Sequence, residues 1–163
     1  AWSCTKTADH ALDCVIAPAV FLASRRTDAY PEGGGWTLGD AATPSALIEA
    51  VHIVTRLHVA LVSTTDPSVR AILWRRPAPR VAPPTDFPPR AALELALHAH
   101  DVCAGLGVPF SPAPDVALHL RDHTRDWPFW DADKVVGWSP LSDGADAWGD
   151  LLRASGRSPI SPT

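Results

Sequence analysis

Six prolines fall between Arg75 and Pro89, at positions 77, 79, 83, 84, 88 and 89. Each proline fixes its own φ angle and lacks a backbone N–H, so this density argues against regular secondary structure in the segment. We therefore expect a partly extended connection there, either a lid or a strap. On both sides of it, apolar residues recur with the spacing of helices.

Two helices are predicted before the proline-rich segment. The first runs from about Ser3 to Arg25 with a serine or threonine cap, and Pro18 inside it predicts a kink or a break. The second begins at Thr43-Pro44, a capping residue followed by proline, and its apolar stripe extends toward Thr65.

Three helices are predicted after the segment. The clearest follows Thr85 or Asp86, opens on Pro88-Pro89 and ends near Ala104 before two glycines. Shorter ones cover residues 115–124 and 144–154, with an aromatic loop between them. Because no strand-like alternation of useful length is visible, we predict an all-α bundle. Residues 1–125 would form the bundle, and residues 126–163 would add the loop and the last helix to the same domain.

Composition narrows the possible partners. The chain has 163 residues, enough for one domain, and its net charge of −4 has the wrong sign for phosphate binding. Apolar stretches such as residues 14–23 fall short of the roughly 20 residues that a membrane span needs. Three cysteines without Cys-x-x-Cys spacing favour a reducing compartment. We therefore predict a cytoplasmic protein with neither a nucleic-acid nor a membrane partner.

Three polar residues share one stripe of the helix that follows the prolines. With Glu94 at zero on a helical wheel, His98 lies at about 40° and Asp101 at about −20°. Burying such groups without partners costs several kcal/mol, so something must satisfy them. A glutamate and a histidine four residues apart can bind one Zn²⁺ ion, and the alternative is an ordinary hydrogen-bonded pair.

A third ligand has to come from another helix. His10 is the best candidate because it shares a helix face with Asp13 and Cys14, although a first-turn histidine can also lie in solvent. A rival metal pair is His119 and His123, again four residues apart. The other histidines are assigned elsewhere: His52 to a solvated edge, His58 to the core and His100 to the far side of its helix.

Three short segments carry a family resemblance. Residues 2–10 read W-S-x-x-x-x-x-x-H, residues 94–107 read E-x-x-x-H-x-x-D and end in Leu-Gly, and residues 148–157 read W-x-x-L-L-x-x-x-G-R. Together they resemble the DinB-like, mycothiol-dependent maleylpyruvate isomerase superfamily. The resemblance implies an up-down helical bundle, here lacking the usual first helix because the chain begins at the Trp-Ser segment.

The resemblance also implies a metal site. Its ligands to a divalent ion, usually zinc, would be His10, Glu94 and His98, which leaves a coordination position open as in catalytic zinc sites. Family members place a low-molecular-weight thiol such as mycothiol at that position. Asp101 would hold an imidazole N–H of a ligand. Arg90, on the same side of its helix, would either meet a substrate carboxylate or lie at the surface.

These features predict a metal-dependent thiol transferase or isomerase, in which a metal-bound thiolate attacks an electrophilic small molecule. Its partners would be a small-molecule thiol and that electrophile. One alternative is a DinB-like metal-binding protein without turnover, and another is a structural domain in which Glu94 and His98 only form a hydrogen bond. Because a bundle lacking one helix exposes apolar surface, we also predict a homodimer.

Overall fold

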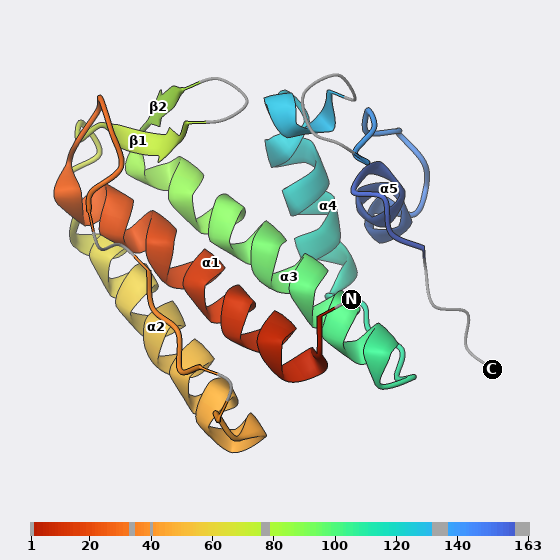
Figure 1. The fold of residues 1–163 in the computed structure, drawn as a ribbon. Coiled ribbons are helices and arrows are strands. Elements are labelled where there is room, and N and C mark those ends of the chain that lie inside the picture. The colour runs from red at the N-terminus through yellow and green to blue at the C-terminus, as the bar shows by residue number, and fades with distance from the viewer. Residues whose placement is uncertain (1, 33–34, 40, 76–78, 132–136, 159–163) are drawn as a thin grey trace.

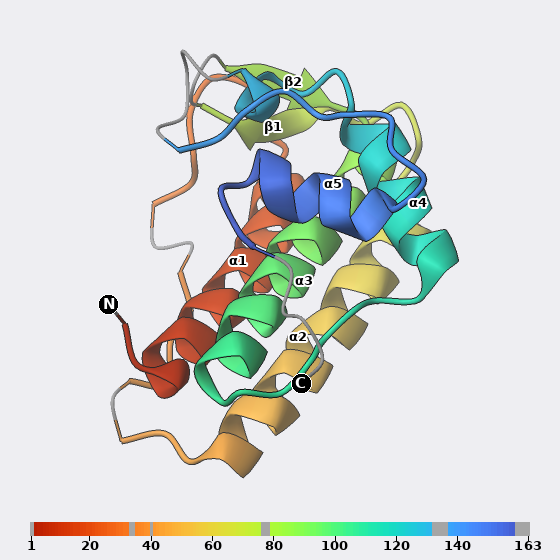
Figure 2. The ribbon, with the colours of Figure 1, turned by 90° about the vertical axis from the view of Figure 1, so that its right-hand side faces the viewer.

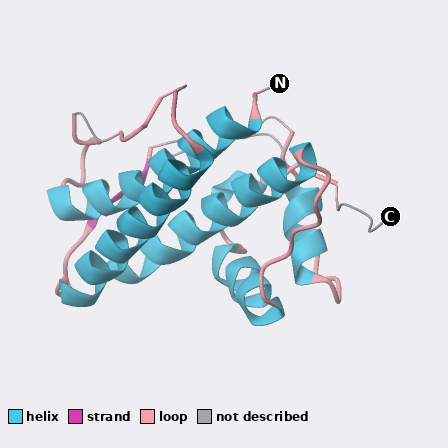
Figure 3. Ribbon diagram, turned by 90° about the horizontal axis from the view of Figure 1, so that it is seen from below, coloured by secondary structure: helices cyan, strands magenta, loops and turns pink. Residues whose placement is uncertain are grey.

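The computed structural model describes residues 2–32, 35–39, 41–75, 79–131 and 137–158. Its helices are α1 (Cys4–Ser24), α2 (Pro44–Thr64), α3 (Phe87–Gly105), α4 (Pro114–Thr124) and α5 (Ala147–Ala154). α1 packs between α2 and α3, while α4 and α5 pack against each other beyond α3 (Figure 1, Figure 2). Helices make up most of the described chain, as Figure 3 shows, so the predicted helical class is confirmed.

The first two helices run parallel, and α3 runs antiparallel to both (Figure 1). Cys4 and Pro44, which begin α1 and α2, line one groove together with Leu106 at the end of α3. The predicted up-down order is therefore wrong for α1 and α2. The chain that connects the end of α1 to the start of α2 is long enough to return along the bundle. Fully extended it reaches about 60 Å, whereas a helix of 21 residues is only about 31 Å long.

Two carboxylates of α1 hold this returning segment. Asp9 accepts hydrogen bonds from the backbone N–H groups of Leu38, at 2.6 Å, and Gly39, at 3.2 Å. One turn later, Asp13 accepts a bond of 3.1 Å from the N–H of Trp36. The acidic residues on this face of α1 thus satisfy backbone donors of the loop.

The ends of the helices follow capping chemistry. Ser3 caps α1 and Thr43 caps α2, each accepting a bond from a backbone N–H three residues later. α5 begins at Ala147 and not at residue 144, because the Asp146 side chain accepts from the N–H of Gly149. Pro18 does not break α1, since it is buried and the packing of the helix on its neighbours outweighs one lost hydrogen bond.

A short hairpin, which the sequence did not predict, accompanies the helices. β1 (Ala71–Trp74) lies just before the proline-rich segment and pairs antiparallel with β2 (Arg80–Ala82), which lies inside the segment expected to lack regular structure. The neighbouring prolines, Pro79 and Pro83, flank β2 and leave the N–H groups of residues 80–82 able to pair. β1 shows no alternation because all four of its residues are buried.

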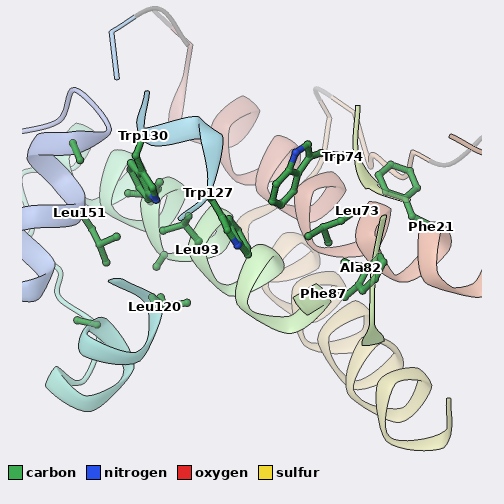
Figure 4. Close-up of a cluster of buried hydrophobic side chains, with 14 of the residues drawn as sticks. Phe21, Leu73, Trp74, Ala82, Phe87, Leu93, Leu120, Trp127, Trp130 and Leu151 are labelled. Atoms are coloured by element: carbon green, nitrogen blue, oxygen red, sulfur yellow. The ribbon is translucent and has the colours of Figure 1, made fainter. Parts of the chain in front are cut away.

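The main core lies where the hairpin, α3, α4 and α5 meet (Figure 4). Trp74 of β1 packs against Trp127, with ring centroids 4.9 Å apart, and Leu151 of α5 is fully buried. Two 3-10 turns, η1 (Pro84–Asp86) and η2 (Pro128–Trp130), lead into α3 and out of α4. Residues from before and after position 126 therefore share one core.

Large apolar side chains on the outer face of α2 are exposed. Ile48, Ile53, Leu57 and Val59 are between 42% and 60% exposed. By length and composition α2 is able to cross a membrane, contrary to the expectation that no stretch is long enough. One such helix is weak evidence for a membrane span.

Candidate metal centre

A thiol and two imidazoles meet between α1 and α3. His10 and Cys14 lie one turn apart on α1, and His98 faces them from α3. One ligand atom of each residue lies within 4.8 Å of the others. Sγ of Cys14 is 3.5 Å from Nε2 of His10, whose ring meets that of His98 edge-on at a centroid distance of 4.9 Å. All three side chains are partly buried, and this donor set suits one metal ion.

The structure brings two of the three predicted metal ligands into one cluster. His10 and His98 belong to the cluster, and Oε2 of Glu94 lies 3.7 Å from Nε2 of His98. Cys14, however, completes the compact group. The sequence placed Cys14 on the same face as His10 without assigning it a ligand role. Its spacing of four residues from His10 is the signal that identifies it.

Asp101 lies beside Nδ1 of His98, where its position on the helix face predicted a carboxylate next to an imidazole nitrogen. Its Oδ2 is 3.3 Å from Nδ1 of His98, within ion-pair distance but without the angle of a hydrogen bond. Arg157 donates two bonds of 2.8 Å to the two oxygens of Asp101. Burial acts to raise the pKa of Asp101, but the bonds and charge of Arg157 outweigh it and hold that pKa below its usual value.

Burial also sets the protonation of the cluster. It lowers the pKa of His98, despite the opposing charge of Glu94, so this imidazole is neutral at pH 7 and able to bind a metal. Burial raises the pKa of Cys14 to about 12, with the charges of Glu94 and Asp13 adding to the effect. The thiol therefore keeps its proton at neutral pH, and a cation bound through sulfur must displace that proton.

The donor chemistry fits zinc. Thiolate sulfur and imidazole nitrogen are typical zinc ligands, whereas magnesium and calcium prefer oxygen. Asp101 beside Nδ1 of His98 matches the carboxylates that orient metal-binding imidazoles, and it leaves Nε2 free for a cation. The residues present therefore suit a zinc ion.

The remaining histidines lie elsewhere. His58 is 3% exposed and its Nδ1 lies 3.1 Å from the carbonyl oxygen of Val15, as expected for a core histidine. His100 is buried on the far side of α3. The rings of His119 and His123 are 5.7 Å apart, but no third ligand joins them within the described ranges.

Comparisons of this chain with protein-family models, with curated proteins and with solved structures found no match.

Proposed function

We propose that this protein is a zinc-dependent enzyme that acts with a small-molecule thiol, as a transferase or an isomerase. The observation that carries the proposal is the group of His10, Cys14 and His98, whose ligand atoms lie within 4.8 Å of one another. The resemblance to the DinB-like superfamily supports it, because that resemblance independently points to His10 and His98 and implies a thiol such as mycothiol.

Each residue has a role in this proposal. His10, Cys14 and His98 hold the ion and leave one position open. A divalent cation supplies a Lewis acid that lowers the pKa of a thiol, so that a nucleophile exists near neutral pH. Glu94, 3.7 Å from His98, accepts the proton that the incoming thiol releases. Asp101, whose Oδ2 lies 3.3 Å from Nδ1 of His98, would favour a proton on Nδ1 and leave Nε2 for the ion.

Elemental analysis of protein purified without chelator tests the metal site. We expect about one zinc per chain, as one site implies. His10→Ala, Cys14→Ser and His98→Ala should each lose it, whereas Glu94→Gln should retain it. His52→Ala is the matched control, because His52 is an exposed histidine on α2. Loss of zinc in Glu94→Gln but not in Cys14→Ser would instead favour His10, Glu94 and His98 as ligands. A parent protein without metal would overturn the proposal.

A metal-binding protein without turnover is the second candidate. It is favoured by the presence of four donors, since Glu94 lies beside the three clustered residues and four ligands fill a tetrahedral zinc site. Replacing zinc by Co²⁺ and adding mercaptoethanol separates the two candidates. An open site predicts a new sulfur-to-metal absorption when the thiol is added, and a closed site predicts an unchanged spectrum.

A further inference from the structure

A cleft of about 460 Å³ opens beside the metal cluster, near the hairpin. This volume is typical of sites for small molecules. Three aromatic rings line it, from Tyr30, Trp74 and Phe129, together with the guanidinium groups of Arg75 and Arg90. Glu94 also lines the cleft and contacts His98, so the cleft borders the cluster.

The aromatic walls are held in place by their neighbours. The rings of Trp74 and Phe129 lie 4.8 Å apart, and Tyr30 is stacked on Phe21 at 4.3 Å with an interplanar angle of 9°. The Tyr30 hydroxyl accepts a 2.7 Å hydrogen bond from the backbone N–H of Arg75. The cleft thus offers rigid, planar apolar surfaces, against which a flat ligand can pack.

Two cations lie against these walls without acidic partners. Arg90 donates to the carbonyl oxygen of Leu73, and its Nε is buried without a hydrogen-bond partner in the described chain. The guanidinium of Arg75 lies 5.7 Å from the centre of the Tyr30 ring. Among the described residues, no carboxylate forms an ion pair with either arginine. Guanidinium groups bind carboxylates well because their paired donors match the two oxygens.

We propose that this cleft binds a small aromatic carboxylate. The carboxylate would bind the guanidinium groups of Arg75 and Arg90, and the ring would lie against Trp74 and Phe129. The other end of the ligand would then face Glu94 and the metal cluster. This ligand would be the electrophilic substrate of the proposed function. The reaction therefore rests on the proposed function, whereas binding of the carboxylate in the cleft does not.

Calorimetric titration of the metal-loaded protein with benzoate tests the cleft. We expect saturable binding of one benzoate per chain. Benzamide, which lacks the charge, and acetate, which lacks the ring, should each bind at least about tenfold more weakly, the size of effect that a charge-assisted hydrogen bond or a stacked ring accounts for. Equal binding of benzoate and benzamide would overturn the inference.

Two variants locate the binding. Arg75→Gln should weaken benzoate binding about tenfold or more, and because Arg75 is exposed this change leaves the core intact. Arg80→Gln is the matched control: Arg80 also lies over the Trp74 ring, at 5.3 Å, but it pairs with Asp86 at 3.1 Å and does not line the cleft. Unchanged binding in Arg75→Gln would overturn the assignment.

Metal analysis of the same samples keeps this inference separate from the proposed function. If benzoate binds and Arg75→Gln abolishes binding while the protein contains no zinc, the cleft stands and the zinc enzyme fails. If zinc is present but benzoate does not bind, the zinc site stands and the cleft inference fails.

Discussion

Arg157 links the C-terminal segment to the metal cluster through Asp101. It holds Asp101 with two hydrogen bonds, and Asp101 borders Nδ1 of His98. Groups that orient a metal-binding histidine typically contribute 10- to 100-fold in metal affinity. We therefore expect Arg157→Gln to weaken zinc binding about tenfold or more, measured by competition with a chromophoric chelator. Arg125→Gln, which removes an exposed ion pair with Asp143, should leave affinity unchanged. Equal affinities in the two variants would mean that Arg157 is purely structural.

His58 makes stability depend on pH. Burial lowers its pKa in the folded chain, against the smaller effect of its bond to Val15. As the pH falls, the unfolded chain takes up the proton first, so stability present above about pH 6.5 is lost progressively below that value. Urea unfolding between pH 7 and 5 should show a steeper loss of stability in the parent than in His58→Leu. Parallel curves for the two proteins would contradict this.

Helical spacing was enough to align residues within one helix, which is why Glu94, His98 and Asp101 were predicted together. It was not enough to predict which side chains on two facing helices lie closest to one another. Whether Cys14 or Glu94 lies closer to His10 depends on how α1 packs against α3. Arg157 was missed because its partner is 56 residues away, a distance that no local pattern spans.

Among the elements, α5 depends most on charge. It has only eight residues, too few for a helix that is stable alone, and its Asp150 is 1% exposed. Burial acts to raise the pKa of Asp150, but hydrogen bonds from Ser142, Arg153, Arg121 and the Gly144 N–H lower it to about 2. This contribution to stability is present above the ordinary aspartate pKa of about 3.9 and is lost as the pH falls toward 2.

Asp150→Asn should therefore destabilise the fold by about 3 kcal/mol, because it removes the buried charge that pairs with Arg121 and leaves that guanidinium only its exposed partner, Asp122. Urea unfolding at pH 7 measures the effect. Asp143→Asn is the control, since its ion pair is exposed and such pairs contribute at most about 1 kcal/mol. A difference below 1 kcal/mol between the two variants would show that α5 is held by apolar packing alone.

The elements that sequence reasoning placed well were those with clear start signals, such as α2 behind the Thr43 cap and α3 at its first-turn prolines. Those that it missed depend on tertiary contacts. A buried four-residue strand such as β1 has no periodicity to detect. The parallel order of α1 and α2 was not predictable either, because the connection between them is long enough for both directions.

At the scale of the whole molecule, the uncovered face of α2 predicts self-association. Glu49 and Arg56 lie two turns apart on this face, and neither pairs with another described residue. In an antiparallel pair of α2 helices related by a two-fold axis, each Glu49 would meet Arg56 of the other copy. Ile53, 42% exposed, would then lie near the axis and be covered. We propose a second copy of this chain as the occupant of that face.

Light scattering coupled to gel filtration tests this dimer, which should be the main species of the parent protein. Glu49→Arg and Arg56→Glu should each shift the protein toward monomer, because each places like charges opposite one another across the axis. The double variant exchanges the two charges and should restore the dimer, a recovery that general destabilisation of α2 cannot produce. A monomeric parent that binds lipid vesicles would instead assign the face to a membrane, and failure of the double variant to recover would rule out the antiparallel pairing.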